Sequence, residues 1–496
     1  MNDADTMVLP RLGPVGGGPE DPWDEDLPAE PRGERCRPVA GTPWIAAWLV
    51  PALVMGVLGA VRAGVPGLGT EELATWRAAT ASWRENWSAL GSAGGTGTPY
   101  HLLMRAWAEA FGSSDLALRV PSVLAMIAAA ALVGAAAARA FTPGTGLLAG
   151  LIFALLPAST RYAQEAQPYA LAVLGAALAT WLLLPTLDRP TRWRLAAYAG
   201  AVAVLGLCHV AALPLLAGHG WAAYAFRRPS AARWLAAASV GALPAATLLW
   251  LVLRDGGRIA PAGRPDLTAL AATPAALFGV AALAGVLFVL ALFSLPLRYP
   301  AAVFTAGAAV PPVVLLLVAQ ATPLWSPQAL LVTLPAWATL AAVALSRVRT
   351  RWSVGVLAVI ALIGAPAQAA VRAPDGHGPA TRQLARIVED RWEPGDRLVY
   401  DAGSGPDVRS VLARYLRADR RPADVTAATV PPTATGCVDV PHCRRLWVVR
   451  PGERADPLPP TDGPTGRMLR VGYRVAQVWR PTGFTLALLV DDRTAR

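Results

Sequence analysis

Two short segments of the chain carry closely spaced polar side chains of the kinds that enzymes use for acid–base chemistry. The first is the adjacent pair Glu71 and Glu72, just after the first long apolar run. Neighbouring carboxylates on a helix point in different directions, so one could deprotonate an acceptor hydroxyl while the other holds a cation or a nearby arginine. The alternative is ordinary helix-start chemistry, with Thr70 as the cap and acids in the first turn.

The second segment has the sequence RYAQEAQPYA at 161–170 and lies between two apolar runs. A short loop outside a membrane does not need so many polar groups, which are Arg161, Tyr162, Gln164, Glu165, Gln167 and Tyr169. They predict either a substrate-binding pocket or a self-satisfied polar network that closes a helix junction, with Pro168 starting the next span. Both interpretations stay open.

A few isolated residues are weaker candidates for a site. His209, at the predicted outer end of a span, is a better ligand or acid candidate than the mid-span His219, because a lone histidine in an apolar stretch is usually packed. The basic segment 254–266 could meet a phosphate or anionic lipid. Cys437 and Cys443 predict a short-loop disulfide if their region is outside the membrane, and free thiols if it is cytoplasmic. Their spacing does not resemble a metal site.

The composition indicates a polytopic membrane protein. Of the 496 residues, 54% are hydrophobic and only 16% are charged, against about 25% charged in a typical soluble protein. Long uncharged runs exclude a soluble enzyme, a disordered chain and a fibrous one. The net charge of +11 comes entirely from arginine and lies largely in short loops between apolar runs, as membrane topology requires. We therefore expect a lipid bilayer as a partner and no nucleic acid.

The apolar runs predict an all-α membrane bundle of about 11 spans. The runs lie at 44–61, 117–138, 146–158, 169–187, 194–210, 211–226, 234–253, 274–297, 300–318, 328–345 and 352–371. With this count, five arginine-containing loops fall on one side if the N-terminus is cytoplasmic. We therefore expect a multi-pass protein of the plasma membrane, with a disordered cytoplasmic tail at 1–40, a membrane domain at 41–371 and the C-terminal region 372–496 outside.

Two segments on the outer side have structure of their own. Within the external segment 62–116, residues 69–91 place Leu73, Trp76, Ala79, Trp83 and Trp87 at helical spacing, and 100–111 forms a second amphipathic stretch. These stretches predict helices that lie in the membrane interface. The region 372–496 predicts a small α/β domain, with helices at 381–392 and 410–418 and strands at 397–401, 445–450, 473–479 and 484–490.

The order of these pieces resembles the bacterial GT-C glycosyltransferases, specifically the mannosyltransferase-like branch related to protein O-mannosyltransferases and the lipid A aminoarabinose transferase. The similarity covers nearly everything from residue 44 onward. It is carried by GTEELATW after the first span and by the later segments TPYHLLMRAWAEAFGSSDLALRVPS, LLAGLIFALLPASTRYAQEAQPYALA, LCHVAALPLLAGHG, SPQALLVTLPA and RQLARIVEDRWEPGDRLVY.

The resemblance implies transfer of a monosaccharide, mannose or an arabinose-like pentose, from a polyprenyl-phosphate donor to a cell-envelope acceptor, with inversion at the anomeric carbon. Glu71 would be the base, with Glu72 beside it. Arg161 would hold the donor phosphate, and Tyr162, Gln164, Glu165 and His209 would line the pocket. A divalent metal ion near the two acids is compatible with the pattern and not required by it.

The chain departs from the family pattern at three positions. Glu71 replaces the usual aspartate of the acidic pair, Gln167 replaces the last arginine of RYAQEAR, and Gln328-Ala329 replaces an Arg-Tyr pair. These changes favour, as an alternative, a catalytically inactive GT-C scaffold or assembly partner in envelope glycan synthesis. A lipid or glycolipid transporter is a third possibility, although the repeated halves typical of transporters are not evident.

Overall fold

The computed structural model describes most of the chain outside the N-terminal tail. The described residues are 43–91, 95–254, 265–294, 299–321, 325–400, 406–424, 444–459, 469–470 and 473–491. The expected disulfide Cys437–Cys443, the tail 1–40 and most of the basic segment 254–266 lie outside them.

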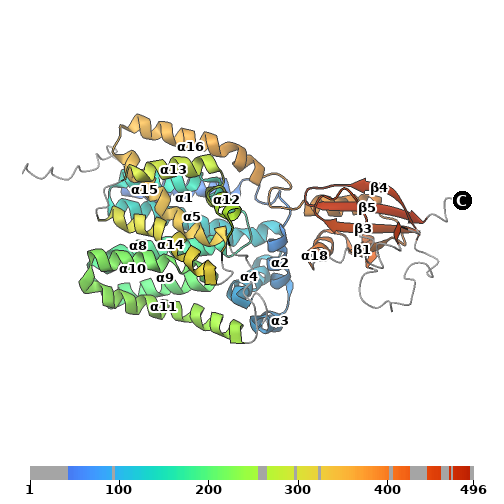
Figure 1. The fold of residues 1–496 in the computed structure, drawn as a ribbon, viewed down its shortest axis with the longest axis horizontal. Helices are drawn as coiled ribbons and strands as arrows, with labels where there is room; N and C mark the ends of the chain where they lie inside the picture. The colour runs from blue at the N-terminus through green and yellow to red at the C-terminus, as the bar shows by residue number, and fades with distance from the viewer. Residues whose placement is uncertain are drawn as a thin grey trace, which may run out of the picture.

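The membrane part is a bundle of helices that run side by side along the long axis of the molecule (Figure 1). Its helices are α1 (Trp44–Ala60), α5 (Asp115–Ala140), α6 (Pro143–Leu155), α7 (Pro157–Ala163), α8 (Tyr169–Asp188), α9 (Arg192–Cys208), α10 (Leu215–Phe226), α11 (Arg228–Arg254), α12 (Leu267–Phe278), α13 (Ala281–Leu292), α14 (Ala301–Ala321), α15 (Leu334–Ser346) and α16 (Thr350–Val371), with short 3₁₀ turns η3 (Val210–Ala212) and η4 (Pro327–Thr333). Alanine-rich faces pack into its core, and large apolar side chains such as Leu53, Leu243 and Leu362 cover its surface. Such a surface requires a lipid environment.

The expected count of about eleven spans is not confirmed by the described helices. By length and composition, six helices among the described residues could cross a membrane, or eight if each of two bent pairs is one span. The pair α6 and α7 bends by 66°, where Pro157 opens the second helix, and α12 and α13 bend by 81° after Gly279. The run at 274–297 is therefore not one straight helix, because its break falls inside it. Trp44–Ala60 and Val210–Phe226 are shorter apolar helices.

The segment 62–116, which the sequence predicts to be external, contains helices α2 (Thr70–Thr80), α3 (Trp83–Ser88) and α4 (Thr98–Phe111), with 3₁₀ turns η1 (Ala89–Gly91) and η2 (Gly95–Gly97). The expectation of a single apolar face over 69–91 is wrong, because Ser82 caps a new helix after a break at Ala81. Leu73 and Ala79 are buried, whereas Trp87 on the second helix is 60% exposed.

The C-terminal region forms a five-stranded sheet with two helices, α17 (Thr381–Arg391) and α18 (Pro406–Tyr415), and a short turn η5 (Ala418–Arg420). Its strands are β1 (Arg397–Tyr400), β2 (Ala423–Asp424), β3 (Arg445–Pro451), β4 (Tyr473–Trp479) and β5 (Phe484–Asp491), in the order β2-β1-β3-β5-β4. Strand β1 is parallel to β2 and β3, whereas β5 is antiparallel to β3 and β4. The small α/β domain expected from the sequence is therefore present, and only the two-residue β2 was missed.

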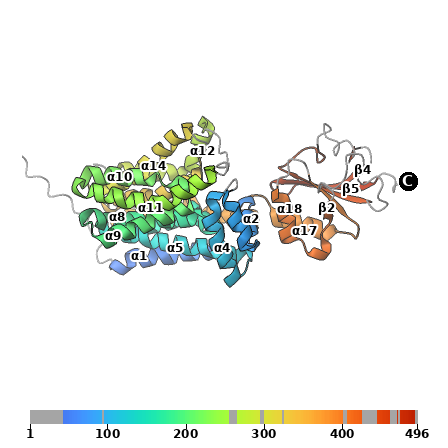
Figure 2. The same ribbon diagram turned by 90° about the horizontal axis from the view of Figure 1, so that it is seen from below.

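This domain lies at the end of the bundle that carries α2, α3 and α4, as both views show (Figures 1 and 2). Asp115, at the start of α5, joins the two parts. Its carboxylate accepts hydrogen bonds from Arg382 (2.5 Å), Arg414 (2.8 Å) and the Tyr415 hydroxyl (2.7 Å). One apolar cluster continues across the junction, from Leu73 to the α17, α18 and sheet residues. The sheet domain is thus packed against α2 and the start of α5.

Candidate active site

The side chain of Glu72 is completely buried, and the hydrogen-bond donors around its carboxylate favour the ionised form. Its two oxygens accept hydrogen bonds from Arg119 at 2.8 and 2.7 Å, from the backbone N–H of Gly69 at 3.0 Å and from that of Ala166 at 2.8 Å. The Nδ1 atom of His377 lies 3.3 Å away. Although burial opposes ionisation, the bonds to Arg119 and His377 hold the pKa of Glu72 well below its usual range. Glu72 is therefore a fixed structural anion.

Two of the roles considered for the acidic pair, closing the start of a helix and holding an arginine, both fall on Glu72. Glu72 closes the start of α2 by accepting the Gly69 N–H, so the cap residue is Gly69 and not the expected Thr70. The same carboxylate holds a neighbouring arginine, Arg119, which was one of the two functional roles considered.

Glu71 has the opposite environment. Its side chain reaches solvent and makes no hydrogen bond or ion pair with any residue that the structure describes. The protein still surrounds enough of the carboxyl group to raise its pKa by desolvation, an effect that Arg161 opposes and the charge of Glu72 reinforces. Glu71 is thus a carboxylate with free proton-accepting capacity and a pKa shifted toward neutrality.

Arg161, near the end of α7, is a partly exposed cation in this region. Its Nη1 donates to the carbonyl of Gly376 at 3.0 Å, and its Nε lies 3.5 Å from the carboxylate of Glu165. Burial raises the pKa of Glu165 to about 7 despite the opposing charge of Arg161. The guanidinium side chain is 34% exposed, so it can still meet an anion from outside.

Gln164 belongs to the helix junction. Its Nε2 donates to the carbonyls of Leu58, Gly59 and Val61 at 3.4, 3.0 and 2.8 Å, which satisfies the open C-terminal end of α1. Gln167 donates to the Thr75 hydroxyl at 3.4 Å. The residues at 161–170 therefore have two roles. The glutamines make hydrogen bonds that join this segment to α1 and α2, whereas Arg161 and Glu165 lie near Glu71.

Aromatic side chains line the same region. Tyr162 meets Tyr169 edge to face with ring centres 5.6 Å apart, and Tyr169 meets His209 in the same way at 5.4 Å. The Nε2 atom of His209 is buried and has no partner among the described residues. His219, by contrast, is satisfied inside the bundle by the hydroxyls of Tyr198 at 2.9 Å and Thr180 at 3.2 Å.

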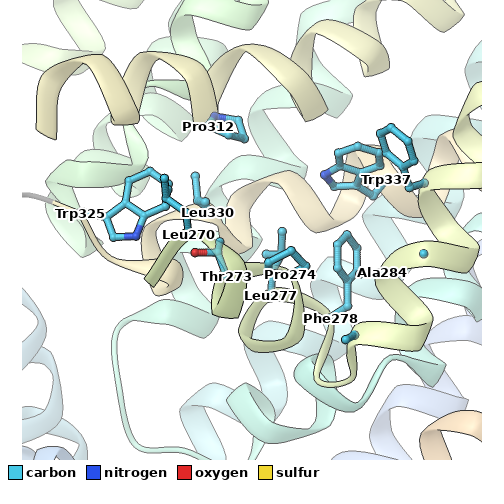
Figure 3. A pocket seen from close by; sticks show the side chains of 13 residues that line it. Leu270, Thr273, Pro274, Leu277, Phe278, Ala284, Pro312, Trp325, Leu330 and Trp337 are labelled. Carbon is cyan, nitrogen blue, oxygen red and sulfur yellow. The ribbon is translucent and has the colours of Figure 1, made fainter. Parts of the chain in front are cut away.

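An apolar groove of about 490 Å³ opens between α12, α13, α14, η4 and α15 (Figure 3). Trp325 and Trp337 lie toward its two ends, with Phe278 and Leu330 between them. The groove wall touches α7, because Gly279 packs so closely on Pro157 that an added Cβ would lie 2.7 Å from the proline Cβ. The apolar groove and the helix that carries Arg161 are therefore neighbours.

Two residues of this network, Arg119 and His377, were not recognised from the sequence. Arg119 carried a usable signal, because a charged residue just inside a predicted span is costly and needs a partner. His377 carried none, since it stands 305 positions from Glu72 in an ordinary polar stretch. Within the described part of the chain, no group of three or more His, Cys, Asp or Glu side chains could hold a metal ion.

The bundle of apolar helices with a docked α/β domain has the GT-C fold, the fold of polytopic glycosyltransferases. Residues 99–253 match the family described as dolichyl-phosphate-mannose-protein mannosyltransferase, so this region is mannosyltransferase-like.

Crystal structures of ArnT from Cupriavidus metallidurans have the same fold. The form bound to undecaprenyl phosphate is 14% identical, with a TM-score of 0.56 over 90% of this chain and 98% of that one. The apo form is also 14% identical, with a TM-score of 0.58 over 90% of this chain and 97% of that one. No curated protein sequence matches the chain.

Proposed function

We propose that the chain is a membrane glycosyltransferase that moves a monosaccharide from a polyprenyl-phosphate donor to a cell-envelope acceptor at the outer face of the membrane. The observation that carries the proposal is the contrast between the two acids. Glu72 is locked by Arg119 and the backbone, whereas Glu71 has no partner among the described residues and lies near Arg161. A free carboxylate beside a partly exposed guanidinium suits transfer from a phosphate leaving group.

In the proposed reaction, Glu71 removes the proton from an acceptor hydroxyl, and the acceptor oxygen attacks the anomeric carbon. The bond from that carbon to the phosphate oxygen breaks on the opposite face, and the polyprenyl phosphate leaves with the electron pair. The sugar configuration inverts, and Glu71 later releases its proton to water. Arg161 stabilises the negative charge that builds up on the phosphate.

The donor lipid fits the apolar groove between α12 and α15. Its lining, which includes Leu270, Leu277, Phe288 and Trp325, offers almost no polar group to a ligand. A polyprenyl tail is the part of the donor that such a lining accepts, with its phosphate toward α7 and Arg161. The undecaprenyl phosphate bound to ArnT supports this choice of lipid class.

The test is sugar transfer by membranes that contain the protein, supplied with labelled polyprenyl-phosphate mannose, pentose and other sugars. Wild type is compared with Glu71→Gln and Arg161→Ala at matched protein levels, and Asp390→Asn, an exposed acid on α17, serves as the control. We expect Glu71→Gln to abolish transfer, Arg161→Ala to reduce it and Asp390→Asn to leave it unchanged. Full transfer by Glu71→Gln would reject the assignment of the base.

The alternative is a catalytically inactive scaffold on the same fold. It is favoured by two glutamines at positions where the resemblance would place arginine. Among the described residues, the side chain of Gln328 accepts one hydrogen bond from Ser326 at 2.6 Å, and that of Gln167 donates one to Thr75 at 3.4 Å. A wild-type protein that binds no polyprenyl phosphate and transfers no sugar would select this alternative.

A further inference from the structure

The segment between α16 and α17 crosses directly over the start of α2. Its Pro374 carbonyl accepts the N–H of Gly67 at 3.1 Å, and its Gly376 carbonyl accepts Arg161 Nη1 at 3.0 Å. His377 comes directly after Gly376, and its Nδ1 atom lies 3.3 Å from the buried carboxylate of Glu72. Its side chain is only 1% exposed. A residue from beyond the last membrane helix is therefore built into the candidate site.

The hydrogen bond to Glu72 determines which ring nitrogen of His377 carries the proton. Glu72 is held ionised by Arg119 and can only accept, so the Nδ1 atom at 3.3 Å is the donor. In a neutral imidazole the other nitrogen, Nε2, then has a free lone pair and is an acceptor. This carboxylate–histidine arrangement is the one that enzymes use to present Nε2 in a fixed tautomer.

The surroundings keep the ring neutral. Burial lowers the pKa of His377, and the positive charges of Arg119 on α5 and Arg161 on α7 lower it further. The hydrogen bond and the charge of Glu72 act in the opposite direction. Because the ring is uncharged, its Nε2 offers a lone pair and no proton.

The Nε2 atom of His377 is buried and has no hydrogen-bond partner among the residues that the structure describes. A buried acceptor without a partner costs about 1–3 kcal/mol, so native proteins usually satisfy it with another protein group, a water or a ligand. A phosphodiester cannot satisfy it, since that anion has no proton to donate. A metal cation is not favoured either, because Arg119 and Arg161 already pair with Glu72 and Glu165, and no group of three or more metal-ligating side chains lies together among the described residues. A hydroxyl group, with one proton to donate and no charge, fits.

We infer that His377 belongs to the carbohydrate-binding site and that its Nε2 accepts a hydrogen bond from a hydroxyl of a bound sugar. This inference rests on the proposed function. The hydroxyl belongs either to the transferred sugar or to a glycan acceptor, since both supply the same chemistry.

The test uses variants that separate the two ring nitrogens. In His377→Asn the amide takes the place of Nδ1 and can still donate to Glu72, while nothing replaces Nε2. In His377→Gln the amide reaches the Nε2 position, and in His377→Phe both functions are lost. Purified full-length protein is titrated with bare polyprenyl phosphate and with polyprenyl-phosphate sugars, with thermal stabilisation as the readout. The acceptor KM is measured in the transfer assay.

We expect His377→Asn to fold as stably as wild type and to bind the bare lipid normally. It should lose about 3- to 10-fold either in affinity for the sugar-bearing lipid or in acceptor KM, which corresponds to one hydrogen bond. His377→Gln should recover part of this loss. A change in lipid-sugar affinity identifies the donor sugar, and a change in acceptor KM alone identifies the acceptor.

Two results would overturn the inference. If His377→Asn matches wild type in both measurements while His377→Phe is unstable, His377 is only a support for Glu72. If wild type binds bare lipid but gains nothing from any sugar and transfers none, no carbohydrate hydroxyl reaches Nε2. A wild-type protein that binds no polyprenyl phosphate at all instead rejects the proposed function, and the inference with it.

Discussion

At the scale of single residues, the Glu72–Arg119 pair shows how a charge can be retained inside the protein. Both side chains are completely buried, and Arg119 also donates to the carbonyls of Ala63, Pro66 and Gly67. We expect Glu72→Gln to destabilise the protein by about 3–5 kcal/mol, because it leaves a buried guanidinium without its counter-charge. Thermal unfolding of the purified protein measures this loss, and an unchanged melting temperature would contradict it.

The same pair gives stability a defined pH dependence. The folded-state pKa of Glu72 lies below its ordinary value of 4.5, so its contribution is complete above that value. The contribution is lost as the pH falls further and the carboxylate is protonated. We expect thermal stability to decline below about pH 4.5 in wild type, and this part of the decline to be absent in Glu72→Gln. Melting temperatures between pH 3 and 7 provide the comparison.

Glu71 predicts a pH dependence of activity. A base must be deprotonated, and desolvation raises the pKa of Glu71, so transfer should increase with pH through a value above 4.5. The neighbouring Glu165, with a pKa raised to about 7, would complicate the profile, and Glu165→Gln removes that ionisation. We expect the acidic limb of kcat/KM to persist in Glu165→Gln. Its disappearance there would assign the limb to Glu165.

At the scale of elements, the start of α2 and the segment after α16 fit together only because Gly69 has no side chain. A Cβ at this position would lie 2.6 Å from the carbonyl oxygen of His377, a backbone atom that cannot easily move. We expect Gly69→Ala to push the two segments apart and to lower transfer about 10- to 100-fold, since misplacement by about 1 Å can cost about 100-fold. Gly355→Ala on α16, where a Cβ would meet nothing, is the matched control for the transfer assay.

Most helices and strands could be predicted from the sequence, because each follows from the local spacing of its apolar residues. The helix over 381–392, the amphipathic helix expected at 100–111 and four of the five strands follow from periodicity, and the structure confirms them as helices and strands. The break at Ala81 was missed because the same apolar spacing continued across it. The acid Glu71 and the cation Arg161 could be named from local sequence. The charge of Arg119 inside an apolar run indicated that it needs a partner, but that partner, Glu72, lies 47 residues away. His377 contacts Glu72 across 305 residues, and no local pattern predicts either contact.

At the scale of the whole molecule, the carboxylate of Asp115 links the sheet domain to the bundle by hydrogen bonds. Asp115 is bound by Arg382, Arg414 and Tyr415, and all three come from α17 and α18. Each such bond to a charged group contributes about 1.5–3 kcal/mol. We expect Asp115→Asn to weaken the contact between the sheet domain and the bundle, and so to speed proteolysis of the segment between α16 and α17. Asp390→Asn should digest like wild type, and equal digestion of both variants would contradict this role.

The contact between Gly279 and Pro157 has a consequence for how the length of a lipid affects the rate. Gly279 adopts a φ of 87° and lies against the first turn of α7, so the groove wall and the helix bearing Arg161 cannot move independently. A polyprenyl tail that fills the groove would then also fix the position of the Arg161 guanidinium. Shortened donors should therefore be slow even at saturation, because binding energy from the remote tail would be used to orient the reacting end. A series of donors of decreasing chain length should lose kcat as well as affinity.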